Sequence, residues 1–170
     1  KMAEAGFVAL SFDQMFWGES GGSPRGAVLP DLYVESFSAG VDYLGTRPFI
    51  DREKIGVIGI CGSGGFAVAA TKIDPRIKAL ATVSMYDMGE YFRTGLNRTR
   101  TAETRNKDLR TAAEQRYTAF ENGTPVYGPG QNDAVFPEAA ESNDFYQTER
   151  GKVASNDRRT PPASYAKFMN

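Results

Sequence analysis

The chain has 170 residues, of which 41% are hydrophobic and 24% charged, and its formal net charge is −1 at pH 7. This composition is typical of a globular protein and excludes a disordered, collagen-like or membrane-spanning chain. Acidic and basic residues are interspersed, so no field of one sign exists that would attract nucleic acid or an anionic membrane. We expect neither as a partner.

The chain contains one cysteine and no histidine. A single cysteine cannot form an internal disulfide and is typical of a reducing compartment, which favours a cytoplasmic location. Without histidine or a second cysteine there is no ligand set for zinc, and we expect no metal and no cofactor. Histidine is also the usual general base near neutral pH, so its absence bears on any catalytic interpretation.

The first 50 residues predict a strand, a loop and a helix. The nearly continuous apolar run at 7–12 is typical of a strand buried on both faces, and the turn-rich segment 17–26 predicts a loop. A helix is expected from about Asp31, which can cap it after Pro30, and Pro48 should end it. Its apolar residues are spaced by three and four positions, as on one helical face: Val34, Phe37, Val41 and Leu44.

The next 35 residues predict a β-α-β unit. A buried strand is expected over 55–60, a tight glycine-rich turn over 61–65, a helix from Phe66 to about Asp74, and another strand over 77–84. Together with the first strand and helix, this order indicates an α/β fold with a parallel sheet and right-handed crossovers.

Beyond about Gly89 the character of the sequence changes. Residues 101–122 are polar and predict a helix that ends at Asn122-Gly123, residues 123–137 are rich in Gly and Pro, and a further helix is expected over about 137–150. No strand of comparable quality follows Ser84. We therefore divide the chain into a partial core, residues 1–90, and a mostly helical lid, residues 91–170.

The segment Gly59-Ile60-Cys61-Gly62-Ser63-Gly64 lies between the predicted strand and helix. It has the pattern of a nucleophile elbow, in which the nucleophile sits on a sharp turn with small residues two places to either side. The small flanks are needed because the backbone is strained and neighbouring chains pass close by. We expect the thiol of Cys61 to project from the sheet edge, with the backbone N–H of Gly62 as one oxyanion donor.

Three other interpretations of this segment stay open. Cys61 could be a small buried core residue, as free cysteines often are. Ser63 is an alternative nucleophile, because its flanks are also small, although it lies one step deeper in the helix. Finally, residues 62–67 match the G-x-G-x-x-A dinucleotide fingerprint, with Asp87 placed where a ribose-binding acid is wanted.

Five segments follow one another along the chain: 7–13, Gly18-Glu19-Ser20-Gly21-Gly22, 41–44, 51–61 and 81–88. In these segments and their order the chain resembles the α/β-hydrolases, and in particular a branch related to dienelactone hydrolases that includes polyketide transferases and thiohydrolases. The resemblance covers residues 1 to about 90 and is looser, as a lid, over the rest. The fold it implies is a partial α/β-hydrolase fold, a parallel sheet flanked by helices with a mostly helical lid.

The resemblance implies a hydrolase or acyltransferase that acts on an ester or thioester, with Cys61 in the nucleophile's place and Gly62 as oxyanion donor. The family's histidine and acid lie on later strands, and its second oxyanion donor lies upstream of Lys1. The chain is therefore interpreted as an internal segment, weak or inactive alone. An acid after this strand, the place of Asp87, serves as the third triad member in some α/β-hydrolases, and a helix cap is the alternative role of Asp87.

Two further expectations concern function and partners. A degenerate, non-catalytic α/β-hydrolase scaffold is the alternative to an enzyme, because no histidine is present. As partners we expect a small-molecule acyl substrate and either the flanking segments or a second copy of the chain, as a homo-oligomer. Exposed sheet edges would otherwise make residues 1–170 prone to aggregate.

Overall fold

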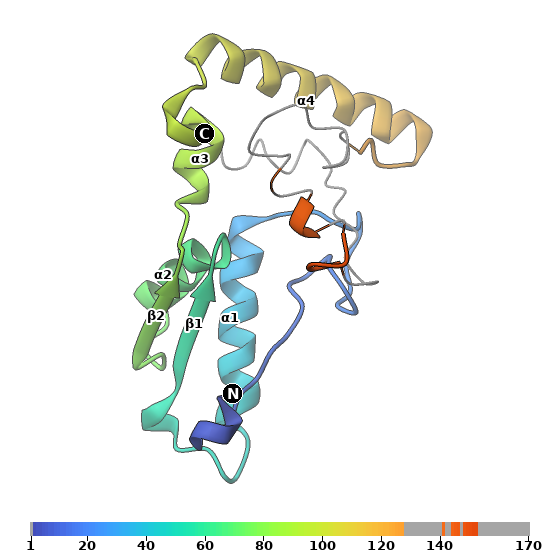
Figure 1. Ribbon diagram of the computed structural model, residues 1–170. Coiled ribbons are helices and arrows are strands. Elements are labelled where there is room, and N and C mark those ends of the chain that lie inside the picture. The colour runs from blue at the N-terminus through green and yellow to red at the C-terminus, as the bar shows by residue number, and fades with distance from the viewer. Residues whose placement is uncertain (1, 128–140, 142–143, 147, 153–170) are drawn as a thin grey trace.

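The computed structural model describes residues 2–127, 141, 144–146 and 148–152. Within this part of the chain, two strands form a parallel sheet, helix α2 packs against it and α1 packs against α2 (Figure 1). The elements in chain order are η1 (Ala3–Ala5), α1 (Pro30–Gly45), η2 (Arg52–Lys54), β1 (Gly56–Ile60), α2 (Ser63–Ile73), β2 (Ala79–Val83), α3 (Met88–Thr94), η3 (Leu96–Arg98) and α4 (Ala102–Asn122).

The unit β1–α2–β2 confirms the predicted parallel pairing. Gly56 lies beside Ala79 and Ile60 beside Val83, so the carboxyl ends of the two strands lie side by side. Helix α2 begins at Ser63, three residues before the predicted start. The turn between β1 and α2 is correspondingly tighter than expected.

The predicted strand over residues 7–12 is wrong for the structure described here, because this segment belongs to neither strand of the sheet. It runs instead along α1, where Leu10 and Phe12 lie against Gly40 and the rings of Phe12 and Phe37 meet edge to face with centroids 5.8 Å apart. A strand needs hydrogen bonds to a neighbouring strand, and none of the described strands lies beside this segment. Its side chains are accordingly exposed, Phe7 by 60%.

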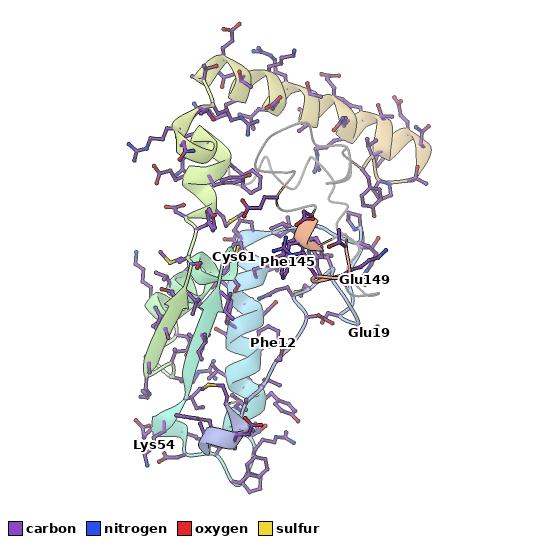
Figure 2. The ribbon with its side chains drawn as sticks, viewed as in Figure 1. Phe12, Glu19, Lys54, Cys61, Phe145 and Glu149 are labelled. Atoms are coloured by element: carbon purple, nitrogen blue, oxygen red, sulfur yellow. The ribbon has the colours of Figure 1, made fainter. Side chains whose placement is uncertain are left out.

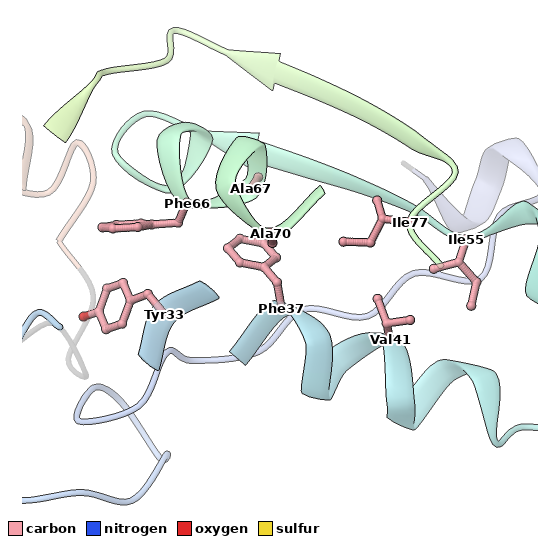
Figure 3. Close-up of a cluster of buried hydrophobic side chains, with 8 residues drawn as sticks. All are labelled: Tyr33, Phe37, Val41, Ile55, Phe66, Ala67, Ala70 and Ile77. Carbon is pink, nitrogen blue, oxygen red and sulfur yellow. The ribbon is translucent and has the colours of Figure 1, made fainter. Parts of the chain in front are cut away.

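The hydrophobic core lies between α1 and α2 (Figure 3). The predicted apolar face of α1 is confirmed, with Phe37 and Val41 buried, while the predicted cap is wrong. Leu29 takes the N-cap position without a side-chain hydrogen bond, and Pro30 begins the helix, where its missing N–H has no cost. The buried cluster comprises Tyr33, Phe37, Val41, Ile55, Phe66, Ala67, Ala70 and Ile77.

The two faces of the sheet differ. Helix α2 packs on one face, with Ala67 and Ala70 fully inaccessible. On the other face the apolar side chains of Ile58, Ile60 and Val83 are 46%, 60% and 51% exposed. The sequence predicted a buried strand over 55–60, and in the described residues helices cover only one face of the sheet.

Helices α3 and α4 follow β2, and α4 lies across the end of the molecule at which β1 and β2 finish (Figure 1). The prediction for α4 is confirmed at both ends, because the side chain of Thr101 caps the N–H of Thr104 and Gly123 follows with a φ of 65°. Half of the helix expected over 137–150 falls outside the described residues. The division into a core of residues 1–90 and a lid of 91–170 stays a prediction. Among the described helices, none has both the length and the apolar character that crossing a membrane requires.

A bidentate ion pair ties the end of α2 to α1. The guanidinium of Arg76 donates to both carboxylate oxygens of Asp74, at 2.9 and 2.7 Å, and also bonds to Asp42 of α1. Asp74 is buried, with 5% exposure, at the C-cap of α2. Hydrogen bonds from Arg76 lower the pKa of the Asp74 carboxyl to about 2, although burial acts in the opposite direction.

We predict an acid-dependent loss of stability from this ion pair. Because the pKa of Asp74 is lower in the folded chain than its ordinary value of 3.8, its contribution is present above about pH 5 and is lost as the pH falls through 3.8 toward 2. Asp74→Asn should lower the free energy of unfolding at pH 7 by about 1–2 kcal/mol and have less effect near pH 2. Urea unfolding at both pH values tests this, with the exposed Asp31→Asn as control. Equal losses at both pH values would contradict it.

Candidate active site

Cys61 occupies the turn between the end of β1 and the start of α2, at the end of the sheet that faces α3 (Figure 2). Its φ is 57°, in the left-handed region that residues with a side chain rarely adopt. The residue is exposed and its thiol is free. As the elbow pattern predicts, the cysteine lies on a strained turn at the carboxyl end of β1. It does not lie in the core.

The backbone of Cys61 is held by three hydrogen bonds. Its N–H donates to the carbonyl of Val83 on β2 at 2.9 Å, and its own carbonyl accepts from Gly64 at 3.0 Å and Tyr86 at 3.3 Å. Strain of this kind persists only where the surroundings fix the backbone. The strand, the helix and the segment after β2 together fix the position from which the thiol projects.

Gly59, two residues before the cysteine, faces the start of α2. A Cβ at this position would come within 2.6 Å of the Gly64 Cα and within 2.8 Å of both the Ser63 carbonyl oxygen and the Ala67 Cβ. Two of these atoms belong to the backbone and cannot move aside as a flexible side chain would. The requirement for a small residue at this flank thus has a direct steric cause.

The N–H of Gly62 is the predicted oxyanion donor. It follows Cys61 at the N-cap of α2, and no hydrogen bond engages it among the described residues. Met88 borders this position, because a Cβ on Gly62 would meet its Sδ at 3.1 Å. A group held at the Cys61 thiol would therefore find one open N–H donor beside an apolar thioether.

The hydroxyl of Ser63, the alternative nucleophile, is engaged by the backbone. Its Oγ accepts from the N–H of Ile60 at 2.9 Å and donates to the carbonyl of the same residue at 2.7 Å. An attacking hydroxyl would have to give up the second of these bonds.

Asp87 caps α3. Its carboxylate accepts a hydrogen bond from the N–H of Glu90 at 2.8 Å, which is the helix-cap alternative weighed from the sequence. The segment 84–88 that carries it nevertheless packs on the elbow through Tyr86 and Met88. The sequence does not predict this contact. The only sequence signal for it is the pair of apolar residues Met85 and Met88 after the strand.

The loop after residues 7–12 is ordered by its own side chains. Asp13 accepts from the N–H of Glu19 at 2.9 Å, and the hydroxyl of Ser20 donates to the Asp13 carbonyl at 2.7 Å. Phe16 is buried, and the indole of Trp17 donates to Ala27 at 3.0 Å while its ring packs against the core. These residues build the loop.

A cavity of about 940 Å³ opens between this loop and the end of α4, and no residue of the elbow lines it. Its walls are Ser23, Pro24 and residues of the 115–126 range. Among the described residues no group of carboxylate, thiol or imidazole side chains could hold a metal ion. The exposed thiol of Cys61 and the N–H of Gly62 are adjacent in the turn before α2.

Comparison with known proteins gives relatives of greater length. No family model matches the chain. It is 46% identical over 153 residues to the uncharacterized protein PA2218 of Pseudomonas aeruginosa, and the matched region covers 88% of this chain and 41% of the relative. It is 37% identical over 78 residues to thiohydrolase aneE of Aspergillus aculeatus, covering 46% of this chain and 24% of the relative. Acyltransferase drtE of Aspergillus calidoustus is 30% identical over 122 residues, covering 72% and 37%. The chain thus spans less than half the length of these relatives.

Two solved structures show which fold the chain has. The crystal structure of PA2218 superposes with a TM-score of 0.93 at 40% identity, covering 99% of this chain and 55% of that one. The α/β hydrolase GrgF from Penicillium superposes with a TM-score of 0.73 at 22% identity, covering 92% and 52%. The chain therefore has an α/β-hydrolase fold in part, a parallel sheet flanked by helices, and its sequence is related to those of thiohydrolases and acyltransferases.

Proposed function

We propose that this chain carries the nucleophile of a hydrolase or acyltransferase that acts on an ester or thioester, with Cys61 as that nucleophile. The observation that carries the proposal is the conformation of Cys61, an exposed thiol at a φ of 57° on the turn between β1 and α2. Strained residues of this kind cluster at functional sites. The relatives named thiohydrolase and acyltransferase support the substrate class, and assignment to the dienelactone hydrolase branch is part of the same proposal.

The chemistry has two steps. The thiolate of Cys61 attacks the substrate carbonyl carbon, an S–C bond forms, and the carbonyl electron pair moves to the oxygen, where the N–H of Gly62 stabilises it. As the intermediate collapses, the bond to the leaving alcohol or thiol breaks and the leaving group takes up a proton. Water or another acceptor then attacks the thioester, releases the acyl group and restores the thiolate.

A base must remove the proton of the thiol and later that of the acceptor. The 170 residues contain no histidine, so we propose that the base lies in a part of the protein outside them. The relatives, of which the chain spans less than half, support this reading. The acyl substrate, the flanking segments as partners and a cytoplasmic location belong to the same proposal.

Selective modification of the thiol tests the proposal. The full-length protein is treated with iodoacetamide, and carbamidomethylation of Cys61 is measured by peptide mass mapping. Hydrolysis of an activated thioester should fall in proportion to this modification, because an alkylated sulfur cannot attack the substrate. Excess thioester should protect both the activity and the thiol. Full activity with Cys61 completely capped would eliminate the cysteine as nucleophile.

A further inference from the structure

We propose that Ser63 is a positioning residue, whose hydroxyl holds the elbow closed so that Cys61 and the N–H of Gly62 face the same substrate carbonyl. The proposal rests on the proposed function, because it assigns the role of a neighbour of the nucleophile. It also gives a use to a side chain that the sequence offers only as an alternative nucleophile.

The two hydrogen bonds of Ser63 close a ring around the turn. Its Oγ accepts from the N–H of Ile60 at 2.9 Å and donates to the carbonyl of Ile60 at 2.7 Å, so the last residue of β1 is joined directly to the first residue of α2. Only Cys61 and Gly62 lie between them. The clamp therefore spans the two residues that supply the nucleophile and the oxyanion donor.

The position of the clamp follows from the sheet. In a parallel strand, the amides of successive residues point to opposite edges. The N–H of Cys61 bonds to Val83 on β2, so the N–H of Ile60 points to the edge away from β2. The hydroxyl of Ser63 meets it there, where none of the described strands offers a partner.

The clamp acts together with the bonds on the Cys61 backbone. Val83 and Tyr86 fix the cysteine from the side of β2, and Ser63 fixes the turn from the opposite edge. Without the hydroxyl, the strained φ of 57° at Cys61 can relax and turn the thiol away from the Gly62 N–H. Acyl transfer needs both groups aligned, whereas simple alkylation needs only an accessible thiol.

This difference defines the test. In the full-length protein, acylation of Cys61 by p-nitrophenyl acetate forms an S–C bond and releases p-nitrophenolate, while iodoacetamide alkylates the same thiol without an oxyanion donor. Ser63→Ala should slow acylation by about tenfold or more but leave alkylation near the wild-type rate, because only acylation depends on alignment. Ser63→Thr, which keeps the hydroxyl, should recover most of the acylation rate.

The matched control is Ser36→Ala. The hydroxyl of Ser36 also donates to a backbone carbonyl, that of Leu32 in α1 at 2.8 Å, and lies outside the elbow. Both rates should stay at wild-type values in this variant. A Ser63→Ala protein that acylates at the wild-type rate, or loses both rates in proportion, would overturn the proposal.

A measurement on the unmodified protein covers the case in which Ser63→Ala does not fold. The Ile60 amide should exchange with solvent roughly tenfold or more slowly than an unstructured amide, because Ser63 holds it. Rapid exchange would overturn the proposal. Failure of the proposed function is recognised separately. An acyl adduct that still forms in Cys61→Ala would show that Cys61 is not the nucleophile, whatever the result for Ser63.

Discussion

Cys61→Ala is expected to reduce thioester hydrolysis by the full-length protein by roughly 10³-fold or more, with little change in stability. Loss of the nucleophile removes the covalent route, and only binding and the oxyanion donor remain. Stability should hold because Cys61 is exposed and makes its hydrogen bonds through the backbone alone. The measurement is kcat/KM of the purified variant, beside its urea unfolding curve.

The control for this prediction is Ser36→Ala, whose lost hydroxyl bonds to Leu32 within α1, outside the elbow. A Cys61→Ala protein with wild-type kcat/KM would show that another group attacks the substrate. A loss of activity accompanied by unfolding would point to structural damage, and the unfolding curve separates the two results.

Gly59→Ala is expected to lower the free energy of unfolding by about 3 kcal/mol, which is a large loss for one methyl group. The new Cβ would lie 2.6 Å from the Gly64 Cα and 2.8 Å from the Ser63 carbonyl oxygen, so β1 and α2 would have to separate. Because the same two elements carry the elbow, acylation of Cys61 should fall with stability. Urea unfolding monitored by circular dichroism provides the value.

Gly21→Ala is the matched control, because a Cβ on Gly21 meets no atom within 4 Å and the residue has no positive φ. It should change the free energy of unfolding by less than about 0.5 kcal/mol. A similar, small effect of both substitutions would show that the contact between β1 and α2 is looser than the structure indicates.

The elements that sequence periodicity predicted well are those stabilised by local signals. Helix α4 was predictable at both ends because Thr101 and Gly123 cap it. The parallel pairing of β1 and β2 followed from the β-α-β order. The start of α2 was placed too late, because glycines favour a turn, whereas here packing against the segment after β2 accommodates them within the helix.

The predictions for residues 7–12 and for the cap of α1 failed for different reasons. Residues 7–12 have a strand-like composition, yet pairing is decided by a neighbour, and the segment packs on α1. Asp31 was a reasonable cap by residue type, but Pro30 already begins the helix and places Asp31 inside the first turn.

In the candidate site, the pattern of small residues predicted the position of Cys61 and the open N–H of Gly62. It could not predict the hydrogen bonds of Ser63 or the contact of Tyr86 with the elbow, because both depend on how the turn closes in three dimensions. The sequence left Asp87 as either a triad acid or a helix cap, and the structure shows its carboxylate engaged as a cap.

The most direct test of the central claim is the chemical identity of the acyl intermediate. The full-length protein is mixed briefly with a thioester, quenched in acid and digested, and the modified residue is located by fragmentation mass spectrometry. We expect the acyl group on Cys61, released by neutral hydroxylamine as a thioester is. An acyl group on Ser63 that resists hydroxylamine, or an unmodified elbow during turnover, would contradict the account.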